Sequence, residues 1–109
     1  MGKSTIWISY DLGVRGDYLG LYGWLDSQGA KECGDSLALL KYEYSGELLD
    51  SLKGDIDGAF EINKRTRIYV IYRDKSTKLM KGTFIHGGRR VPPWAGLSGE
   101  GEQVEDDES

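Results

Sequence analysis

The sequence is poor in the residues that build disulfides, metal centres and membrane spans. It contains one cysteine, one histidine and two prolines in 109 residues. A single cysteine excludes an internal disulfide and a cysteine-based zinc site, and a single histidine excludes a histidine-rich metal centre. No apolar run approaches the roughly 20 residues of a membrane-spanning helix. We therefore expect a protein of a reducing, cytoplasmic compartment with no membrane partner and no cofactor.

The composition does supply a core, and its charge is unevenly distributed. Hydrophobic residues make up 39% and aromatic residues 11% of the chain, which suits one compact domain and argues against global disorder. Residues 1–63 hold 11 acids and 5 bases, residues 64–90 hold 9 bases and one acid, and residues 98–109 hold six acids and no base. This pattern predicts a folded domain over residues 1–97 and a disordered acidic tail over residues 98–109.

Hydrophobic periodicity and turn residues predict seven short elements in the folded part, or six if residues 30–44 form one broken strand. Runs of β-branched and aromatic residues predict strands, while apolar residues at helical spacing after a capping residue predict helices. We expect Asp17 and Ser45 to cap the two helices, and we expect Gly29 to end the first. The predicted elements are strand 5–10, helix 17–28, strands 30–33 and 37–44 (or one strand broken at 34–36), helix 45–58, strand 67–73, turn 74–77 and strand 78–85.

The order of these elements predicts the fold class. A strand, a helix and a strand followed by a helix and two strands is typical of an α+β, ferredoxin-like two-layer sandwich. In that fold both helices cover one face of an antiparallel sheet. The other face stays open, which in a domain of this size favours dimerisation or ligand binding.

Several short segments resemble a known family. The segments are Ile8-Ser9-Tyr10-Asp11-Leu12, Gly29-Ala30-Lys31, Ser36-Leu37-Ala38-Leu39 and Thr66-Arg67-Ile68-Tyr69-Val70-Ile71. Over about residues 5–72 the chain resembles the ferredoxin-fold proteins of the CRISPR adaptation nuclease-like group and the related SinR-like proteins. The resemblance implies a homodimer joined through sheet edges and terminal strands, with a link to bacterial or phage defence. It also implies that Asp11, which follows a tyrosine at the end of the first strand, holds Mg²⁺ or Mn²⁺ across the dimer axis.

Three residue types have a catalytic interpretation and a structural one. Asp11 could hold a metal if a second copy supplied another carboxylate, but a loop aspartate that caps backbone N–H groups is the favoured interpretation. His86 ends a strand beside Gly87, and we expect it to be structural or solvent-facing. Cys33 has no neighbouring partner for catalysis, so we expect a buried or edge thiol.

The basic segment offers the strongest candidates for binding. Arg67, Tyr69, Ile71 and Arg73 share one face of the predicted strand, and cations beside aromatic rings suit phosphate contact with base stacking. In the alternative interpretation, the lysines protect an edge strand of the sheet from aggregation with other sheets. Trp94 either folds back over an apolar edge or anchors an extended segment in a partner's groove. The candidate binding residues are Arg67, Tyr69, Arg73, Lys75, Lys78, Lys81, Arg89, Arg90 and Trp94.

The sequence thus favours a small, non-enzymatic, homodimeric binding or adaptor protein that acts on a protein or a nucleic acid. The alternative is a metal-dependent endonuclease, acting on RNA or DNA, with Asp11 at a metal site in the dimer interface. The acidic tail solubilises the protein, screens the basic hairpin, or binds a basic partner.

Overall fold

The computed structural model describes residues 2–99, so most of the predicted acidic tail lies outside the described residues. No helix in residues 2–99 is long and apolar enough to cross a membrane. The elements in chain order are β1 (Gly2–Asp11), α1 (Tyr18–Ser27), β2 (Lys31–Gly34), β3 (Leu37–Tyr44), α2 (Leu48–Ala59), β4 (Arg67–Arg73) and β5 (Met80–His86).

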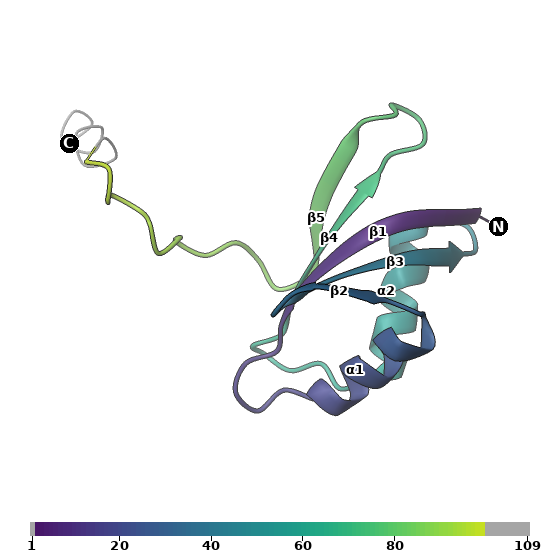
Figure 1. Cartoon of the computed structure of the whole chain (residues 1–109), viewed down its shortest axis with the longest axis horizontal. Helices are drawn as coiled ribbons and strands as arrows, with labels where there is room; N and C mark the ends of the chain where they lie inside the picture. Colours follow the sequence, from purple (N-terminus) through teal and green to yellow (C-terminus); the bar gives the residue numbers. More distant parts are fainter. Residues whose placement is uncertain (1, 100–109) are drawn as a thin grey trace.

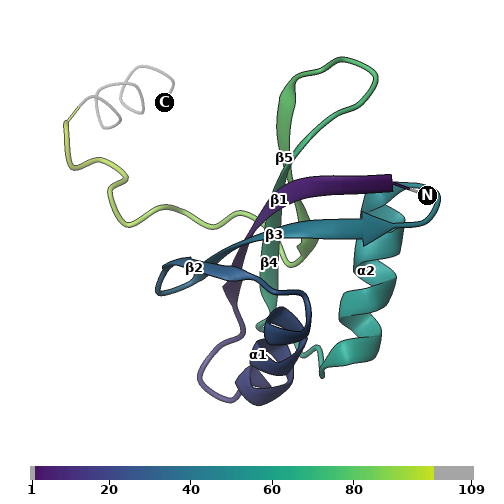
Figure 2. The ribbon, with the colours of Figure 1, turned by 45° about the vertical axis from the view of Figure 1, so that its right-hand side comes forward.

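The strands form one antiparallel sheet, with both helices on one of its faces (Figures 1 and 2). The strand order is β2-β3-β1-β4-β5, and β1 pairs with both β3 and β4. The first four strands therefore make the ferredoxin-like arrangement, and β5 extends it at one edge. The predicted α+β two-layer sandwich is confirmed.

The core lies between the sheet and the two helices. Alternate residues of β1 point toward the helices, so Ile6 and Ile8 are fully buried while their chain neighbours remain partly exposed. The helices meet them with Leu21 of α1 and with Leu52 and Ile56 of α2, all fully buried. Burying one side chain of this size is worth roughly 1.5–3 kcal/mol, so each of these five residues contributes substantially to the stability of the fold.

Asp17 ties the start of α1 to the segment that follows α2. Its Oδ1 accepts a hydrogen bond from the Gly20 amide at 2.9 Å, and its Oδ2 accepts one from the Glu61 amide at 3.1 Å. These two bonds, that from Glu61 first, hold the pKa of Asp17 below its usual value. The predicted helix cap is confirmed, and so is Gly29, whose φ of 68° ends the helix in the left-handed region.

Tyr42 joins β3 to α2 through its hydroxyl group. The side chain is 1% exposed, its Oη donates to Asp55 Oδ2 at 2.5 Å, and it shares a hydrogen bond of 2.9 Å with Ser51 Oγ. Burial, together with the hydrogen bond to Asp55, raises the pKa of Tyr42 to about 12. The neutral hydroxyl is therefore part of the folded state at all ordinary pH values.

Three predicted element starts are wrong by two or more residues. The first strand begins at Gly2 rather than at residue 5. The second helix begins at Leu48 with Glu47 as its N-cap, and Ser45 does not cap it. Instead the Ser45 amide donates to Ser51 Oγ at 3.4 Å, so the loop before the helix is longer than expected. The last strand begins at Met80 rather than at residue 78, because Lys78 has a φ of 67° and still belongs to the turn.

Of the two interpretations of Trp94, the one in which it folds back over the domain is wrong. Residues 88–99, here called the arm, run away from the sheet after β5 (Figures 1 and 2). In the arm Trp94 is 69% exposed, and Val91 and Leu97 are exposed as well. The chain turns into the arm at Gly87, whose φ is 75° and where a Cβ atom would lie 2.8 Å from the Thr66 carbonyl oxygen. Glycine is therefore required at the root of the arm.

Candidate functional site

The sheet face opposite the helices is uncovered, and we call it the open face. A row of half-buried apolar side chains crosses it, because Leu39, Trp7 and Ile71 are register partners on β3, β1 and β4. Polar and charged residues surround this row. From the register and the alternation along the strands, the open face comprises Thr5, Trp7, Ser9, Asp11, Leu37, Leu39, Lys41, Arg67, Tyr69, Ile71, Arg73, Met80, Gly82 and Phe84.

Two aromatic rings lie together on the β4–β5 side of the open face. Tyr69 and Phe84 are register partners, and their ring centroids are 4.8 Å apart at an interplanar angle of 66°. The far end of the Tyr69 ring lies over Gly82, where a Cβ atom would be only 2.6 Å from Tyr69 Cζ. A glycine at this position therefore allows the ring to lean across β5. We call Tyr69 and Phe84 the aromatic platform.

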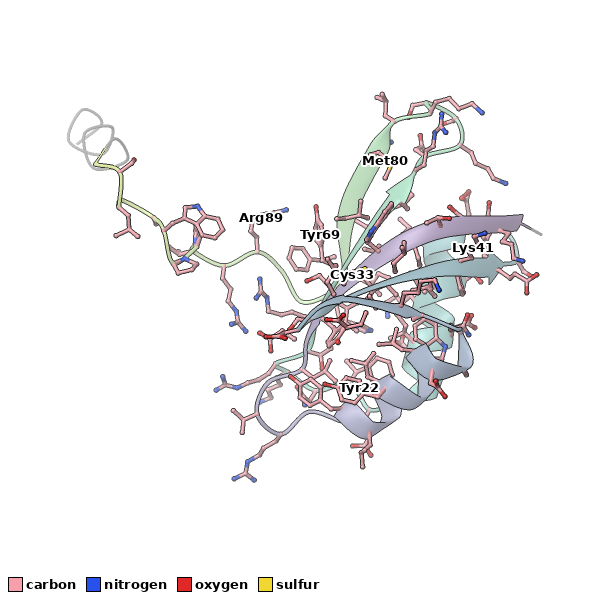
Figure 3. All side chains as sticks on the ribbon, viewed as in Figure 1. Tyr22, Cys33, Lys41, Tyr69, Met80 and Arg89 are labelled. Atoms are coloured by element: carbon pink, nitrogen blue, oxygen red, sulfur yellow. The ribbon has the colours of Figure 1, made fainter. Side chains whose placement is uncertain are left out.

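Two arginines lie over the aromatic platform. Arg67 Cζ is 5.6 Å from the Phe84 centroid, and Arg89 Cζ is 5.7 Å from the Tyr69 centroid and 5.6 Å from that of Phe84. Figure 3 shows Arg89 at the root of the arm, beside Tyr69. Arg67 is also held by its Nε, which donates to the Gly88 carbonyl oxygen at 3.1 Å. Within about 6 Å of a ring face, a guanidinium group gains a favourable cation–π interaction.

Asp11 lies at the end of the same surface. A pocket of about 260 Å³ is lined by Ser9, Tyr10, Asp11, Arg67, Tyr69, Phe84 and Arg89. Asp11 is the register partner of Arg67, and its Oδ1 accepts a hydrogen bond from the Gly13 amide at 3.0 Å. Asp11 therefore caps one backbone N–H group of the loop that follows β1. Within residues 2–99, no three His, Cys, Asp or Glu side chains gather into a group that could hold a metal ion.

The other predicted binding residues lie apart from the aromatic platform. Lys75 Nζ lies 5.1 Å from the centroid of the Tyr44 ring, which belongs to the helix-facing side of β3. Lys81 Nζ is 3.5 Å from Asp74 Oδ2. Lys78 lines a cleft of about 510 Å³ between the β4–β5 turn and the start of α2. The structure thus brings Arg67, Tyr69 and Arg89 together but places these three lysines around the tip of the hairpin.

Asp74 organises that hairpin tip. Its Oδ2 accepts hydrogen bonds from Ser76 Oγ at 2.9 Å and from Thr77 Oγ1 at 2.8 Å, and another from the Thr77 amide at 3.2 Å. These bonds, with that of the Thr77 side chain foremost, lower the pKa of Asp74 to about 2. The carboxylate therefore stays ionised and holds the turn between β4 and β5.

His86 and Cys33 have structural environments. His86 Nε2 lies 2.6 Å from Asp57 Oδ1, so the histidine connects β5 to α2, in agreement with the structural interpretation. Lys53 Nζ contacts Asp57 Oδ2 at 2.8 Å, and this bond together with the His86 contact lowers the pKa of Asp57. Cys33 is exposed on β2, an edge strand.

Phe84 and Gly82 are site residues that the sequence analysis missed. Both lie on the open face, at alternate positions of β5 with Met80, so the period of two was present in the sequence. The sequence did not show which sheet face these two residues occupy, because the pairing of β4 with β5 shifts in register between Ile68 and Tyr69. Such a shift cannot be located without knowing the partner strand.

Comparisons of the chain with protein-family models, with curated proteins and with solved structures found no match. What the open face binds is therefore inferred from its own side chains.

Proposed function

We propose that the protein is a small, non-enzymatic, cytoplasmic binding protein that holds single-stranded nucleic acid on its open face. The observation that carries the proposal is the aromatic platform, whose two rings lie 4.8 Å apart with Arg67 and Arg89 over them. Stacking of a base on an aromatic ring is worth about 1–3 kcal/mol and tolerates many sequences. Arginines supply the complementary contact to phosphate oxygens.

Duplexes fit this surface less well than single strands. Bases in a duplex are stacked on one another, so a ring on a protein surface cannot reach their faces, whereas an unpaired strand presents them. The exposed thiol of Cys33 is compatible with the reducing cytoplasm that we propose. A protein partner is the other outcome, and it would use the apolar row of Leu39, Trp7 and Ile71.

The experiment is a fluorescence-anisotropy titration with labelled single-stranded RNA and DNA of mixed sequence. Tyr69→Ala and Arg89→Ala should each weaken binding about tenfold or more. Tyr22→Ala and Arg15→Ala are matched controls, because both residues are exposed and Tyr22 lies on α1 (Figure 3). Affinity should also fall as salt rises, since phosphate contacts release counterions.

A third variant separates the position of the ring from its presence. Gly82→Val keeps Tyr69 but pushes the end of its ring off β5, and valine is well tolerated in strands. We expect weaker binding at an unchanged or higher melting temperature. If the wild-type protein binds neither the RNA nor the DNA oligonucleotide, the proposal is refuted and a protein partner becomes the remaining hypothesis.

We further propose that the protein forms a homodimer, as the family resemblance implies. Val91, Trp94 and Leu97 of the arm are 83%, 69% and 79% exposed, and a second copy can cover such side chains where one chain does not. Light scattering at tens of micromolar protein (a concentration that reveals weak dimers) should give twice the monomer mass. Trp94→Ala should lower that mass, and a monomer at these concentrations would contradict the assignment.

The nuclease alternative requires a second carboxylate from another copy near Asp11. Incubating the same oligonucleotides with Mg²⁺ or Mn²⁺, and separately with a chelator, tests it directly. Metal-dependent cleavage that Asp11→Ala abolishes would replace the non-enzymatic proposal. Oligonucleotides that stay intact under every condition would support the non-enzymatic proposal.

A further inference from the structure

We infer that the pocket beside the aromatic platform accepts one base of the bound strand and that Asp11 makes it selective for guanine. The inference rests on the proposed function, because it concerns the same surface. It adds a base identity and a residue that determines specificity.

The size of the pocket suits one base. Its volume of about 260 Å³ lies below the roughly 300–1,000 Å³ of pockets for drug-sized ligands. Ser9 lies on β1 directly across from Tyr69 in the register, so the pocket spans the two central strands next to the ring. A strand stacked on Tyr69 therefore places a neighbouring base over Ser9, within reach of the end of β1.

The polar groups at that end select among the four bases. An ionised carboxylate only accepts hydrogen bonds. The Asp11 side chain is exposed, and among residues 2–99 the hydrogen bond from the Gly13 amide to Oδ1 is its one assigned polar contact. Guanine presents two adjacent donors, N1–H and the N2 amino group, which match the two carboxylate oxygens. Adenine, cytosine and uracil each place an acceptor beside a donor on that edge, and this acceptor repels a carboxylate.

The neighbouring cations favour the same arrangement. Arg67 is held beside Asp11 by the register and by its bond to the Gly88 carbonyl oxygen, yet no ion pair joins Arg67 to Asp11 among the described residues. The carboxylate is therefore available to a base while the guanidinium groups of Arg67 and Arg89 face the platform. Binding of guanine would pair the carboxylate's acceptors with donors and leave the arginines for the phosphates on either side.

The test uses six-nucleotide oligonucleotides with one variable position in a uridine host (RNA) or a thymidine host (DNA). Anisotropy titrations in chelator exclude any metal bound by Asp11. Wild-type protein should bind the guanine oligonucleotide on the order of tenfold more tightly than the adenine, cytosine or host sequence. Asp11→Asn keeps an oxygen for the Gly13 amide but turns one acceptor into a donor, so the preference should disappear. Asp26→Asn, the same charge change at an exposed position of α1, should leave the preference intact.

The outcomes separate this inference from the proposed function. Equal binding of all four sequences by the wild-type protein would overturn the guanine selectivity alone, and it requires no variant. A guanine preference that survives in Asp11→Asn would overturn the role of Asp11. Absence of binding to every oligonucleotide would overturn both proposals. A guanine preference seen with only one of the two nucleic acids would support the selectivity and would show whether the natural ligand is RNA or DNA.

Discussion

Replacement of Tyr42 by phenylalanine isolates one buried hydroxyl group that links the sheet to α2. The change removes the hydrogen bonds to Asp55 and Ser51 without removing the ring. A hydrogen bond to a charged group contributes about 1.5–3 kcal/mol, and the exposed Asp55 side chain recovers part of that from water. We expect the free energy of unfolding at pH 7 to fall by about 1–2 kcal/mol, or roughly 4–16 °C in melting temperature.

The difference between the two proteins should shrink at alkaline pH. The folded-state pKa of Tyr42 is raised to about 12 from the ordinary value of 10.0, so the unfolded chain loses its proton first as pH rises. The stability that the neutral hydroxyl gives is therefore fully present below pH 10 and is lost as pH rises toward 12. From the two pKa values the loss is about 2 kcal/mol by pH 11.5.

Urea unfolding followed by circular dichroism at pH 7, 10, 11 and 11.5 measures both effects. The other ionising groups are common to the two proteins, so the wild-type minus Tyr42→Phe difference reports Tyr42 alone. We expect that difference to fall toward zero or change sign by pH 11.5. A difference that stays constant from pH 7 to 11.5, or a variant as stable as wild type at pH 7, would refute this account of the buried hydroxyl.

Three further predictions concern the surface. The pKa of Asp74 is lowered to about 2. The stability that its carboxylate gives is therefore complete above the unfolded-state pKa of 3.8 and is lost as pH falls through 2. The melting temperatures of wild type and Asp74→Ala should differ at pH 5 and converge near pH 2. Asp11→Ala should lower the melting temperature in calorimetry only modestly, because one exposed amide, that of Gly13, loses its partner; a large drop would show a wider structural role. Deleting residues 98–109 should tighten oligonucleotide binding, most strongly at low salt, because six tethered acids no longer compete for the basic segment; an unchanged salt dependence in a mobility-shift titration would contradict it.

Local patterns sufficed to predict the elements whose boundaries depend on their own residues. β4 has the predicted bounds because Ile68 and Val70 alternate with partly exposed neighbours. β1 begins three residues earlier than predicted, at Gly2, because residues 2–4 pair with residues 42–44 of β3. No local signal in Gly2-Lys3-Ser4 specifies that pairing, so tertiary structure determines it.

The candidate site was predictable only in part for the same reason. A strand period of two places Arg67, Tyr69 and Arg73 on one face without any knowledge of the fold. Phe84 and Arg89 join Tyr69 through the β4–β5 register and the turn at Gly87, and neither follows from spacing. A count of charges does not separate the lysines of the hairpin from the arginines. In the structure Lys75 and Lys78 lie in the turn that Asp74 organises, and Lys81 contacts Asp74 from β5.

The central position of β1 has a consequence for the order in which the protein can fold during its synthesis. β1 lies in the middle of the sheet and is made before its two partners, β3 and β4, which end at residues 44 and 73. At roughly 5–20 residues per second, about 3–12 seconds separate the synthesis of Asp11 from that of Arg73. During that interval the hydrogen-bonding edge of β1 that pairs with β4 has no partner strand. The nascent chain is therefore a better client for a chaperone than the finished protein, and rapid overproduction should favour aggregation through this strand.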